Sequence, residues 1–149
     1  MIELTKLTKR FAQHTAVDNL SFQVAPGEVL GFLGPNGAGK STTMKMLTGF
    51  LEPTSGTAKV FGRDIRRETI AVQRQIGYLP EGAPCYGDMS VRAFLDFIAQ
   101  VRGYRGAEQV RRVDRVLSEL ELVAEQRQSI ETLSKGFKRR VGLAQAILH

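Results

Sequence analysis

The 149-residue sequence contains one cysteine, no tryptophan and two histidines. Its single cysteine, Cys85, cannot form an internal disulfide, which excludes a disulfide-stabilised secreted scaffold. No apolar run approaches the roughly 18 residues that a membrane-spanning helix needs, and the first residues lack the apolar core of a signal peptide. We therefore expect a cytoplasmic protein that reaches a membrane only through a partner.

Acidic residues are fewer than basic ones, because 15 Asp and Glu stand against 21 Lys and Arg, which gives a net charge of +6. The basic pairs are scattered and have no aromatic residues between them, so the signature of a nucleic-acid groove is missing. We expect no direct contact with nucleic acid. Three interpretations of the charge stay open, namely a solvated basic surface, nucleotide phosphates and anionic lipid headgroups.

Hydrophobic periodicity predicts mainly β-structure in the first half of the chain. We expect strands near residues 2–7, 20–24 and 57–62. The apolar run 29–33 predicts a buried parallel strand, and residues 76–79 predict a further short strand.

Helical patterns follow the glycine-rich loop and become dominant after Pro80. Residues 41–47 contain helix formers and end near a glycine. Ser90 could cap a second helix. A third helix is indicated by an i, i+3, i+4, i+7 stripe, which we interpret as core packing. The stripe consists of Val110, Val113, Val116, Leu117 and Leu120. We interpret residues 85–132 as a helical subdomain.

The glycine-rich segment 34–41 matches the phosphate-loop pattern of Gly, four residues and Gly-Lys-Ser, between an apolar run and a helix. Glycines allow successive N–H groups to turn inward as an anion nest, and the helix N-terminus adds positive dipole. Lys40 would reach the β- and γ-phosphates, and the Ser41 hydroxyl would bind Mg²⁺. The alternative is a flexible glycine turn. The predicted site consists of Gly34, Pro35, Asn36, Gly37, Ala38, Gly39, Lys40 and Ser41.

A second motif, Leu133-Ser134-Lys135-Gly136-Phe137, precedes a helical segment. A serine and a glycine at a helix N-terminus can form another anion site, although Ser134 alone could be a simple helix cap. With the phosphate loop, this motif makes the sequence resemble the ATP-binding subunits of ABC transporters over its whole length. Its variants are similar to those of bacterial exporters of the drug-export and gliding-motility type.

This resemblance implies an α/β fold: a P-loop NTPase core with an N-terminal antiparallel β-subdomain and an inserted helical subdomain, incomplete at the C-terminus. The implied division is 1–84, 85–132 and 133–149. The implied ligands are ATP and Mg²⁺. The implied partners are membrane-spanning subunits and a second ATP-binding subunit, in a homodimer or heterodimer, peripheral on the inner face of the cell membrane. ATP binding would clamp the dimer and hydrolysis would release it.

The resemblance also implies roles for single residues. Phe11 would stack on adenine, unless it is only a core residue, and Val17 and Thr42 would join the nucleotide contacts. Ser134, Lys135 and Gly136 would close on the γ-phosphate held by the partner copy. Glu81, at the position of the family's loop glutamine, would bind Mg²⁺ and, with Lys40, act in catalysis, unless it is a solvated acid. Membrane-subunit contact, or else packing between subdomains, is implied for Pro84, Tyr86 and Met89.

The sequence departs from the family pattern in what it lacks. Lys135 replaces the first signature glycine, and Phe137 replaces a glutamine. The apolar strand that ends in a magnesium-binding Asp and a catalytic Glu does not occur, and the sequence stops at His149. We expect an ATPase by resemblance whose 149 residues bind nucleotide far better than they hydrolyse it. The rivals are a nucleotide-binding fragment without turnover and an ATPase of DNA repair or translation.

An incomplete sheet has a packing consequence. We expect an exposed apolar edge beside the phosphate loop, and a helix after the signature that has lost its cover. The helix residues concerned are Val141, Ala144, Ile147 and Leu148. Poor solubility or self-association would follow.

Overall fold

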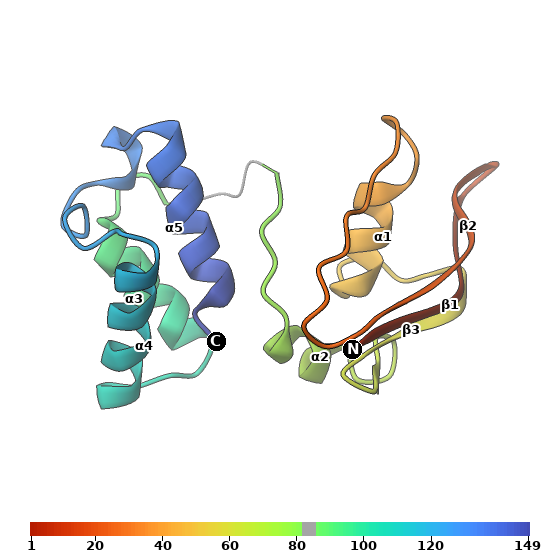
Figure 1. Ribbon diagram of the computed structural model, residues 1–149, viewed down its shortest axis with the longest axis horizontal. Helices are drawn as coiled ribbons and strands as arrows, with labels where there is room; N and C mark the ends of the chain where they lie inside the picture. The colour runs from red at the N-terminus through yellow and green to blue at the C-terminus, as the bar shows by residue number, and fades with distance from the viewer. Residues whose placement is uncertain (82–85) are drawn as a thin grey trace. The chain divides into compact units, whose positions relative to one another are not determined.

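The computed structural model describes residues 1–81 and 86–149 (Figure 1). Two compact units are present, Met1–Ile76 and Gly77–His149. Predictions about Pro84 and Cys85 fall outside the described residues. No helix among the described residues is both long enough and apolar enough to cross a bilayer.

An antiparallel sheet forms the frame of the first unit, with strand order β2-β1-β3-β4. Strands β1 (Ile2–Phe11) and β2 (His14–Val24) are joined as a hairpin, in which Phe11 faces His14. The other edge of β1 pairs with β3 (Ser55–Val60), from Ile2 opposite Val60 to Thr8 opposite Ser55, and the short β4 (Arg63–Asp64) follows. The predicted antiparallel β-subdomain is confirmed.

Two helices complete this unit, α1 (Lys40–Leu47) and α2 (Thr69–Gln75). Their apolar residues share one buried cluster with residues of the strands. Ala58 and Val60 on β3 alternate as expected for a strand, whereas Leu4 and Leu7 on β1 are three residues apart, because the register shifts between them. The cluster consists of Leu4, Leu7, Val17, Met46, Leu47, Ala58, Val60, Ile65 and Val72.

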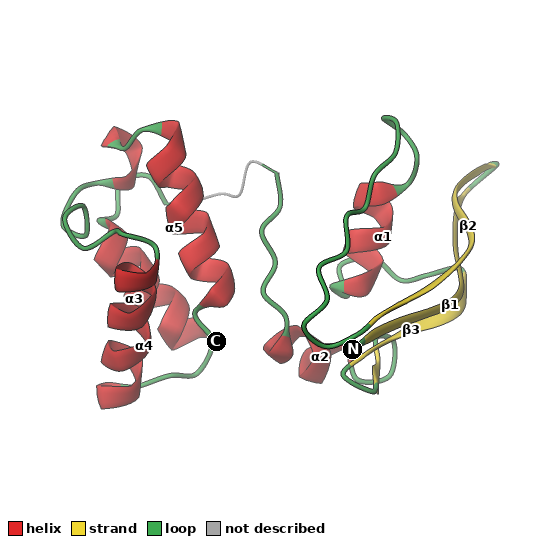
Figure 2. Cartoon of the chain, viewed as in Figure 1, coloured by secondary structure: helices red, strands yellow, loops and turns green. Residues whose placement is uncertain are grey.

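The strand predicted at residues 29–33 is wrong. This segment is a loop between β2 and α1 (Figure 2). Val29 and Leu33 are 96% and 93% exposed. The physical reason is that a strand needs a hydrogen-bonded neighbour, and no described residue pairs with this segment. The apolar side chains beside the phosphate loop are exposed as expected, but they belong to a loop and not to the edge of a sheet. Residues 76–79 do not form the predicted strand either. Helix α2 ends at Gln75, and residues 76–79 continue without regular secondary structure.

The second unit is helical and contains α3 (Val91–Val101), α4 (Gly106–Glu119), the 3-10 helix η1 (Ile130–Thr132) and α5 (Lys135–Ile147). Ser90 caps α3 as predicted, because its hydroxyl accepts a hydrogen bond from Ala93 N at 3.2 Å. The stripe on α4 buries Val113, Val116 and Leu117, and Leu120 is partly buried against them. Core packing is wrong for Val110, which is 47% exposed near the start of the helix.

The apolar face of α5, the helix after the second motif, is buried and not exposed as expected. Val141, Ala144 and Leu148 are fully buried, and Ile147 is half-buried against the same cluster. The expectation of exposure is therefore wrong for this helix, since the apolar face of α5 packs within the unit against residues of α3 and α4 such as Phe94 and Val113.

Candidate nucleotide-binding site

The glycine-rich loop turns sharply into α1. Gly37 and Gly39 have φ values of +85° and +83°, a left-handed conformation that glycine adopts without steric cost. Gly39 is also the N-cap of α1. A Cβ atom on Gly39 would lie 2.3 Å from the carbonyl oxygen of Ala16 and 3.0 Å from a methyl group of Val17. Strand β2 therefore packs directly against the loop, and Val17 and Gly39, both predicted site residues, lie side by side.

The Lys40 side chain is hydrogen-bonded to the start of its own loop. Its Nζ donates hydrogen bonds to the carbonyl oxygens of Gly34 at 2.6 Å and Pro35 at 2.8 Å. Within the loop, Ala38 N donates to Pro35 O at 3.2 Å. The ammonium group is thereby held beside the first residues of the loop, and the five residues before Gly39 stay exposed.

The loop contains a cationic side chain, Lys40, and no carboxylate. No acidic residue occurs between Glu28 and Glu52, and the first turn of α1 has none. Among the described residues, neither Gly37 N nor Gly39 N donates a hydrogen bond that would occupy it. Free N–H groups, a helix N-terminus and one ammonium are the elements of a phosphate site. The residues present therefore fit a triphosphate.

Mg²⁺ fits the same place only together with phosphate oxygens. Ser41, in the first turn of α1, is exposed, and Thr42 follows it half-buried. No group of three His, Cys, Asp or Glu in the described part of the chain could hold a metal ion by itself. Mg²⁺ commonly takes one or two protein ligands plus substrate phosphates, so Ser41 would be the hydroxyl ligand that the loop supplies.

Phe11 lies at the tip of the hairpin and is 46% exposed, so the core alternative does not apply to it. The ammonium of Lys9 is 5.2 Å from the ring centroid. Lys9 is also the residue of β1 that faces Val17 on β2. One hairpin therefore carries both the exposed ring and the residue that contacts the loop.

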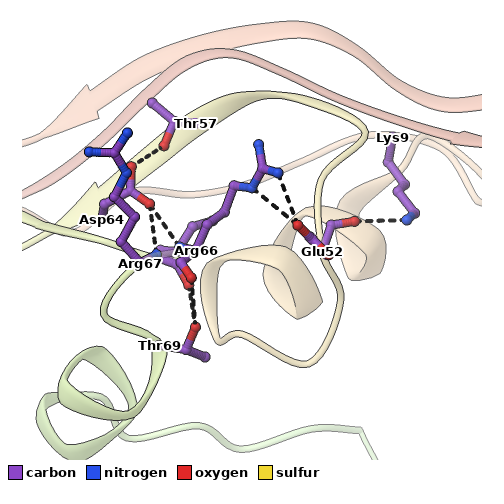
Figure 3. A network of polar contacts seen from close by, with 8 residues as sticks. Lys9, Glu52, Thr57, Asp64, Arg66, Arg67 and Thr69 are labelled. Carbon is purple, nitrogen blue, oxygen red and sulfur yellow. Dashed lines mark hydrogen bonds and ion pairs between the residues drawn. The ribbon is translucent and has the colours of Figure 1, made fainter.

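A polar network braces the chain after α1 against the sheet (Figure 3). Lys9 Nζ donates to the carbonyl oxygen of Glu52 at 2.7 Å, and the Glu52 carboxylate pairs with Arg66 at 3.0 Å. Asp64 accepts hydrogen bonds from the Thr57 hydroxyl at 2.6 Å and from the backbone N–H groups of Arg66 and Arg67. The Thr57 bond, with these N–H groups, lowers the pKa of Asp64 although burial opposes the shift.

The second motif begins α5. Ser134 is its N-cap, and its hydroxyl accepts a hydrogen bond from Phe137 N at 3.4 Å. Ser134, Lys135 and Gly136 are exposed, and a Cβ on Gly136 would meet no atom closer than 3.8 Å. Phe137 packs on the helical core, and the Arg140 guanidinium lies 5.4 Å from its ring. The turn is thus an open helix N-terminus that bears a lysine.

The predicted site residues are divided between the two units. The phosphate loop, Phe11 and Val17 belong to Met1–Ile76, whereas Glu81 and the turn 134–136 belong to Gly77–His149. Glu81 is exposed. In that second unit, Tyr86 is 57% exposed and stacks edge-on against Phe94 and Phe97, and Met89 packs against the helical core.

Sequence reasoning missed two supports of the loop. The carbonyl of Ala16 packs against Gly39, and nothing in the sequence signals this backbone contact. The buried Thr43 hydroxyl donates to Gly39 O at 3.0 Å. A threonine four residues after the N-cap was a readable signal for the second contact, because Ser and Thr in helices bond to the carbonyl four residues before them.

Comparison with known proteins agrees with this geometry. A family model described as ABC transporter matches residues 17–149. The chain is 39% identical over its whole length to the probable multidrug ABC transporter ATP-binding protein YbhF of Escherichia coli, covering 26% of that protein. It is 40% identical to the ABC transporter ATP-binding protein YxlF of Bacillus subtilis, covering 49% of it.

Among solved structures, cbiO1 from Clostridium perfringens, described as part of the ABC transporter complex cbiONQ, superposes with a TM-score of 0.87 at 25% identity. That match covers 99% of this chain and 61% of cbiO1. The chain thus spans half or less of the curated relatives named above. The mixed α/β fold with an antiparallel β-subdomain, the phosphate loop and the family match agree, and the chain belongs to the ABC transporter family of ATP-binding proteins.

Proposed function

We propose that the loop 34–41 binds the phosphates of ATP with Mg²⁺, and that the chain is the nucleotide-binding, energy-coupling part of an ABC transporter. The observation that carries this proposal is Lys40, whose ammonium is held at 2.6 Å and 2.8 Å by two carbonyls of its own loop. An ammonium fixed beside unoccupied N–H donors can bind a triphosphate with little rearrangement.

Each part of the loop has a distinct task in this proposal. The N–H groups of residues 36–39 and the N-terminus of α1 bind phosphate oxygens, and Lys40 neutralises the terminal phosphates. Ser41 supplies a hydroxyl to Mg²⁺, which neutralises phosphate charge when bound. The exposed face of Phe11 stacks on the base. Thr42, which is half-buried, would join these contacts, whereas Val17 is 7% exposed and supports the loop by packing against Gly39.

The turn 134–136 is proposed to act in a dimer. An exposed helix N-terminus with Lys135 suits an anion brought by another molecule. In the head-to-tail arrangement that the family implies, this turn would close on the terminal phosphate held by the loop of a second subunit. Glu81 would approach Mg²⁺ in the position of the family's loop glutamine.

Coupling to a membrane is proposed through a separate subunit on the inner face of the cell membrane. Support comes from cbiO1, which is described as part of a transporter complex. Tyr86, exposed and held by two aromatic neighbours, is the proposed apolar contact with that subunit. The description of YbhF as a multidrug transporter protein supports an export role.

A second candidate function is nucleotide binding without turnover by the 149 residues themselves. It is favoured by the sequence, in which no apolar strand leads to an Asp-Glu pair. Phosphoryl transfer to water needs a group that orients the water as well as charge neutralisation. Lys40 and Glu81 would then supply binding and metal contact only.

The test is Mg-ATP binding, measured by calorimetry, on the wild-type chain and on Lys40→Ala. Loss of charge-assisted hydrogen bonds to phosphate should weaken binding about 10- to 100-fold. Lys45→Ala, which removes an exposed lysine in the last turn of the same helix, is the matched control and should bind normally. Equal affinity for Lys40→Ala and wild type would refute the proposed site.

Turnover separates the two candidate functions. The 149-residue chain should bind ATP through Lys40, and only a polypeptide extended through the acidic strand should hydrolyse it. Equal rates for both polypeptides would show that residues of this chain, Glu81 first, are sufficient for hydrolysis.

A further inference from the structure

Lys9 and Phe11 lie on the same face of strand β1, because side chains two residues apart on a strand point to the same side. The pairing of β1 with β2 shifts next to Lys9, but the extra residue, Ala16, is on β2, so the alternation of β1 continues. The ammonium of Lys9 accordingly lies over the Phe11 ring, 5.2 Å from its centroid. A cation within roughly 6 Å of the centroid is attracted to the face of an aromatic ring.

The Lys9 side chain has a second contact that fixes its position. Lys9 is half-buried, and its Nζ donates a hydrogen bond to the carbonyl oxygen of Glu52 at 2.7 Å (Figure 3). The acceptor belongs to the main chain, and two residues further on Thr54 N donates to Thr8 O at 2.8 Å. Strand β1 and the segment after α1 are therefore joined on both sides of the contact. The ammonium over the ring is held in place, although the tip of the hairpin is exposed.

The same hairpin also contacts the phosphate loop. Lys9 is opposite Val17 in the register, and Val17 packs against Gly39 of the loop. Among the described residues, however, the Lys9 side chain donates no hydrogen bond to the loop 34–41 and bonds to Glu52 instead. A change of Lys9 should therefore act on the ring and not on the contacts that bind phosphate.

We propose that Lys9 is a positioning residue for the nucleotide base. Its ammonium fixes the Phe11 ring from one face, and the opposite face of this ring, which is 46% exposed, receives the base. A side chain that is held before binding loses less conformational entropy when a ligand stacks on it. The inference rests on the proposed function, since it requires a nucleotide whose phosphates occupy the loop 34–41.

The first experiment compares ATP with inorganic tripolyphosphate, which has three phosphates but no base. Binding of each, with Mg²⁺, is measured by calorimetry on the wild-type chain and on Lys9→Met. Methionine keeps an unbranched apolar side chain but has no charge and no hydrogen-bond donor. Loss of the cation over the ring should weaken ATP binding by about 2- to 5-fold. Tripolyphosphate binding should stay unchanged.

The ratio of the two affinities is the quantity that matters, because the loss of a positive charge at long range would weaken both ligands alike. Lys59→Met is the matched control. Lys59 is exposed on β3 of the same sheet, so the same chemical change is made away from the hairpin tip. This control should leave both affinities and their ratio unchanged.

The second experiment asks whether Lys9 acts through Phe11. In the double variant Lys9→Met/Phe11→Ala, the lysine change should have no further effect on ATP affinity, because the ring through which it acts is absent. Lys9→Arg keeps a cation that can lie over the ring and a donor for Glu52, so it should restore most of the ATP affinity. Restored binding also shows that residue 9 can be changed without loss of the fold.

Three results would overturn the inference while the proposed function stands. One is wild-type ATP affinity in Lys9→Met. Another is an equal loss of ATP and tripolyphosphate binding in that variant, which would mean that Lys9 only attracts phosphate. The third is an effect of Lys9→Met that persists in full without the Phe11 ring.

Failure of the proposed function gives a different result. The wild-type chain would then bind neither ATP nor tripolyphosphate, or Lys40→Ala would bind both as the wild type does. Either result would remove the basis of the role proposed for Lys9 as well.

Discussion

The helical unit and the sheet unit differ in whether their apolar segments find packing and hydrogen-bonding neighbours within the unit. In Gly77–His149, helices α3, α4 and α5 bury their apolar faces in one cluster, from Val91 to Leu148. In Met1–Ile76, the antiparallel strands have their partners, but the apolar run 29–33 has none among the described residues. Helices satisfy their backbone groups internally, whereas a strand depends on another strand. The same apolar richness therefore gives a closed core in one unit and an exposed segment in the other.

The largest expected effect is a loss of stability in the helical unit. Phe94→Ala removes a ring that is 1% exposed at the centre of the helical cluster, which should lower the free energy of unfolding by about 3–5 kcal/mol. Hydrogen exchange should rise in α3, α4 and α5 while the sheet stays protected. Val101→Ala, 69% exposed on the same helix, is the control and should change little. Equal loss of protection in both units would contradict the assignment of Phe94 to the core of the helical unit.

The next effect concerns the loop of the sheet unit. Gly39→Ala forces an alanine to φ +83° with its Cβ 2.3 Å from Ala16 O, which should cost about 2 kcal/mol or more and weaken ATP binding. Gly37→Ala has nearly the same φ but open space around it, so only the conformational cost of about 1–2 kcal/mol applies. Chemical denaturation compares the two. A larger loss for Gly37→Ala would refute the proposed packing of β2 on the loop.

A smaller effect compares two helix caps inside the helical unit. Ser90 accepts from Ala93 N at 3.2 Å and Ser134 accepts from Phe137 N at 3.4 Å. Replacing Ser90 by alanine should cost about 1 kcal/mol, and Ser134→Ala should cost less because its bond is longer. Thermal unfolding of both variants gives the ranking. The reverse ranking would mean that Ser134 holds α5 by more than this cap.

The smallest effect is a pH dependence in the sheet unit. The pKa of Asp64 is lowered by the Thr57 hydroxyl and by two backbone N–H groups. Because the folded pKa lies below the unfolded one, this contribution to stability is complete above the ordinary value of 3.8 and is lost as pH falls through the folded pKa. Asp64→Asn should flatten acid unfolding of the sheet unit below about pH 4. If this variant unfolds in acid as the wild type does, the acid sensitivity of the sheet unit arises from other carboxylates.

The sequence predicted the elements that are satisfied locally. Strand segments within β1 and β2, the helix that Ser90 caps and the stripe on α4 follow from alternation, capping chemistry and helical spacing, all of which act within a few residues. The tight hairpin that joins β1 to β2 was not among the predictions. The fixed spacing of its glycines, lysine and serine predicts the phosphate loop. These features need no knowledge of distant parts of the chain.

The two failures among the strands and the one at α5 have a common cause. The apolar content of residues 29–33 and 76–79 predicts strands, but it says nothing about a hydrogen-bonded neighbour. The buried state of Val141 and Leu148 depends on how α5 meets α3 and α4, which periodicity cannot specify. Likewise, the spacing of the loop glycines could not show that Gly39 is crowded and Gly37 is open.

The pairing of β1 with β3 has a consequence for the order of folding. Ile2 pairs with Val60, so the phosphate loop and α1 lie between the two paired strands in the sequence. The β1–β2 hairpin can form early because its strands adjoin in sequence, whereas β3 must wait for a slow closure between distant residues. During synthesis, the second edge of β1 therefore stays open until Val60 has left the ribosome.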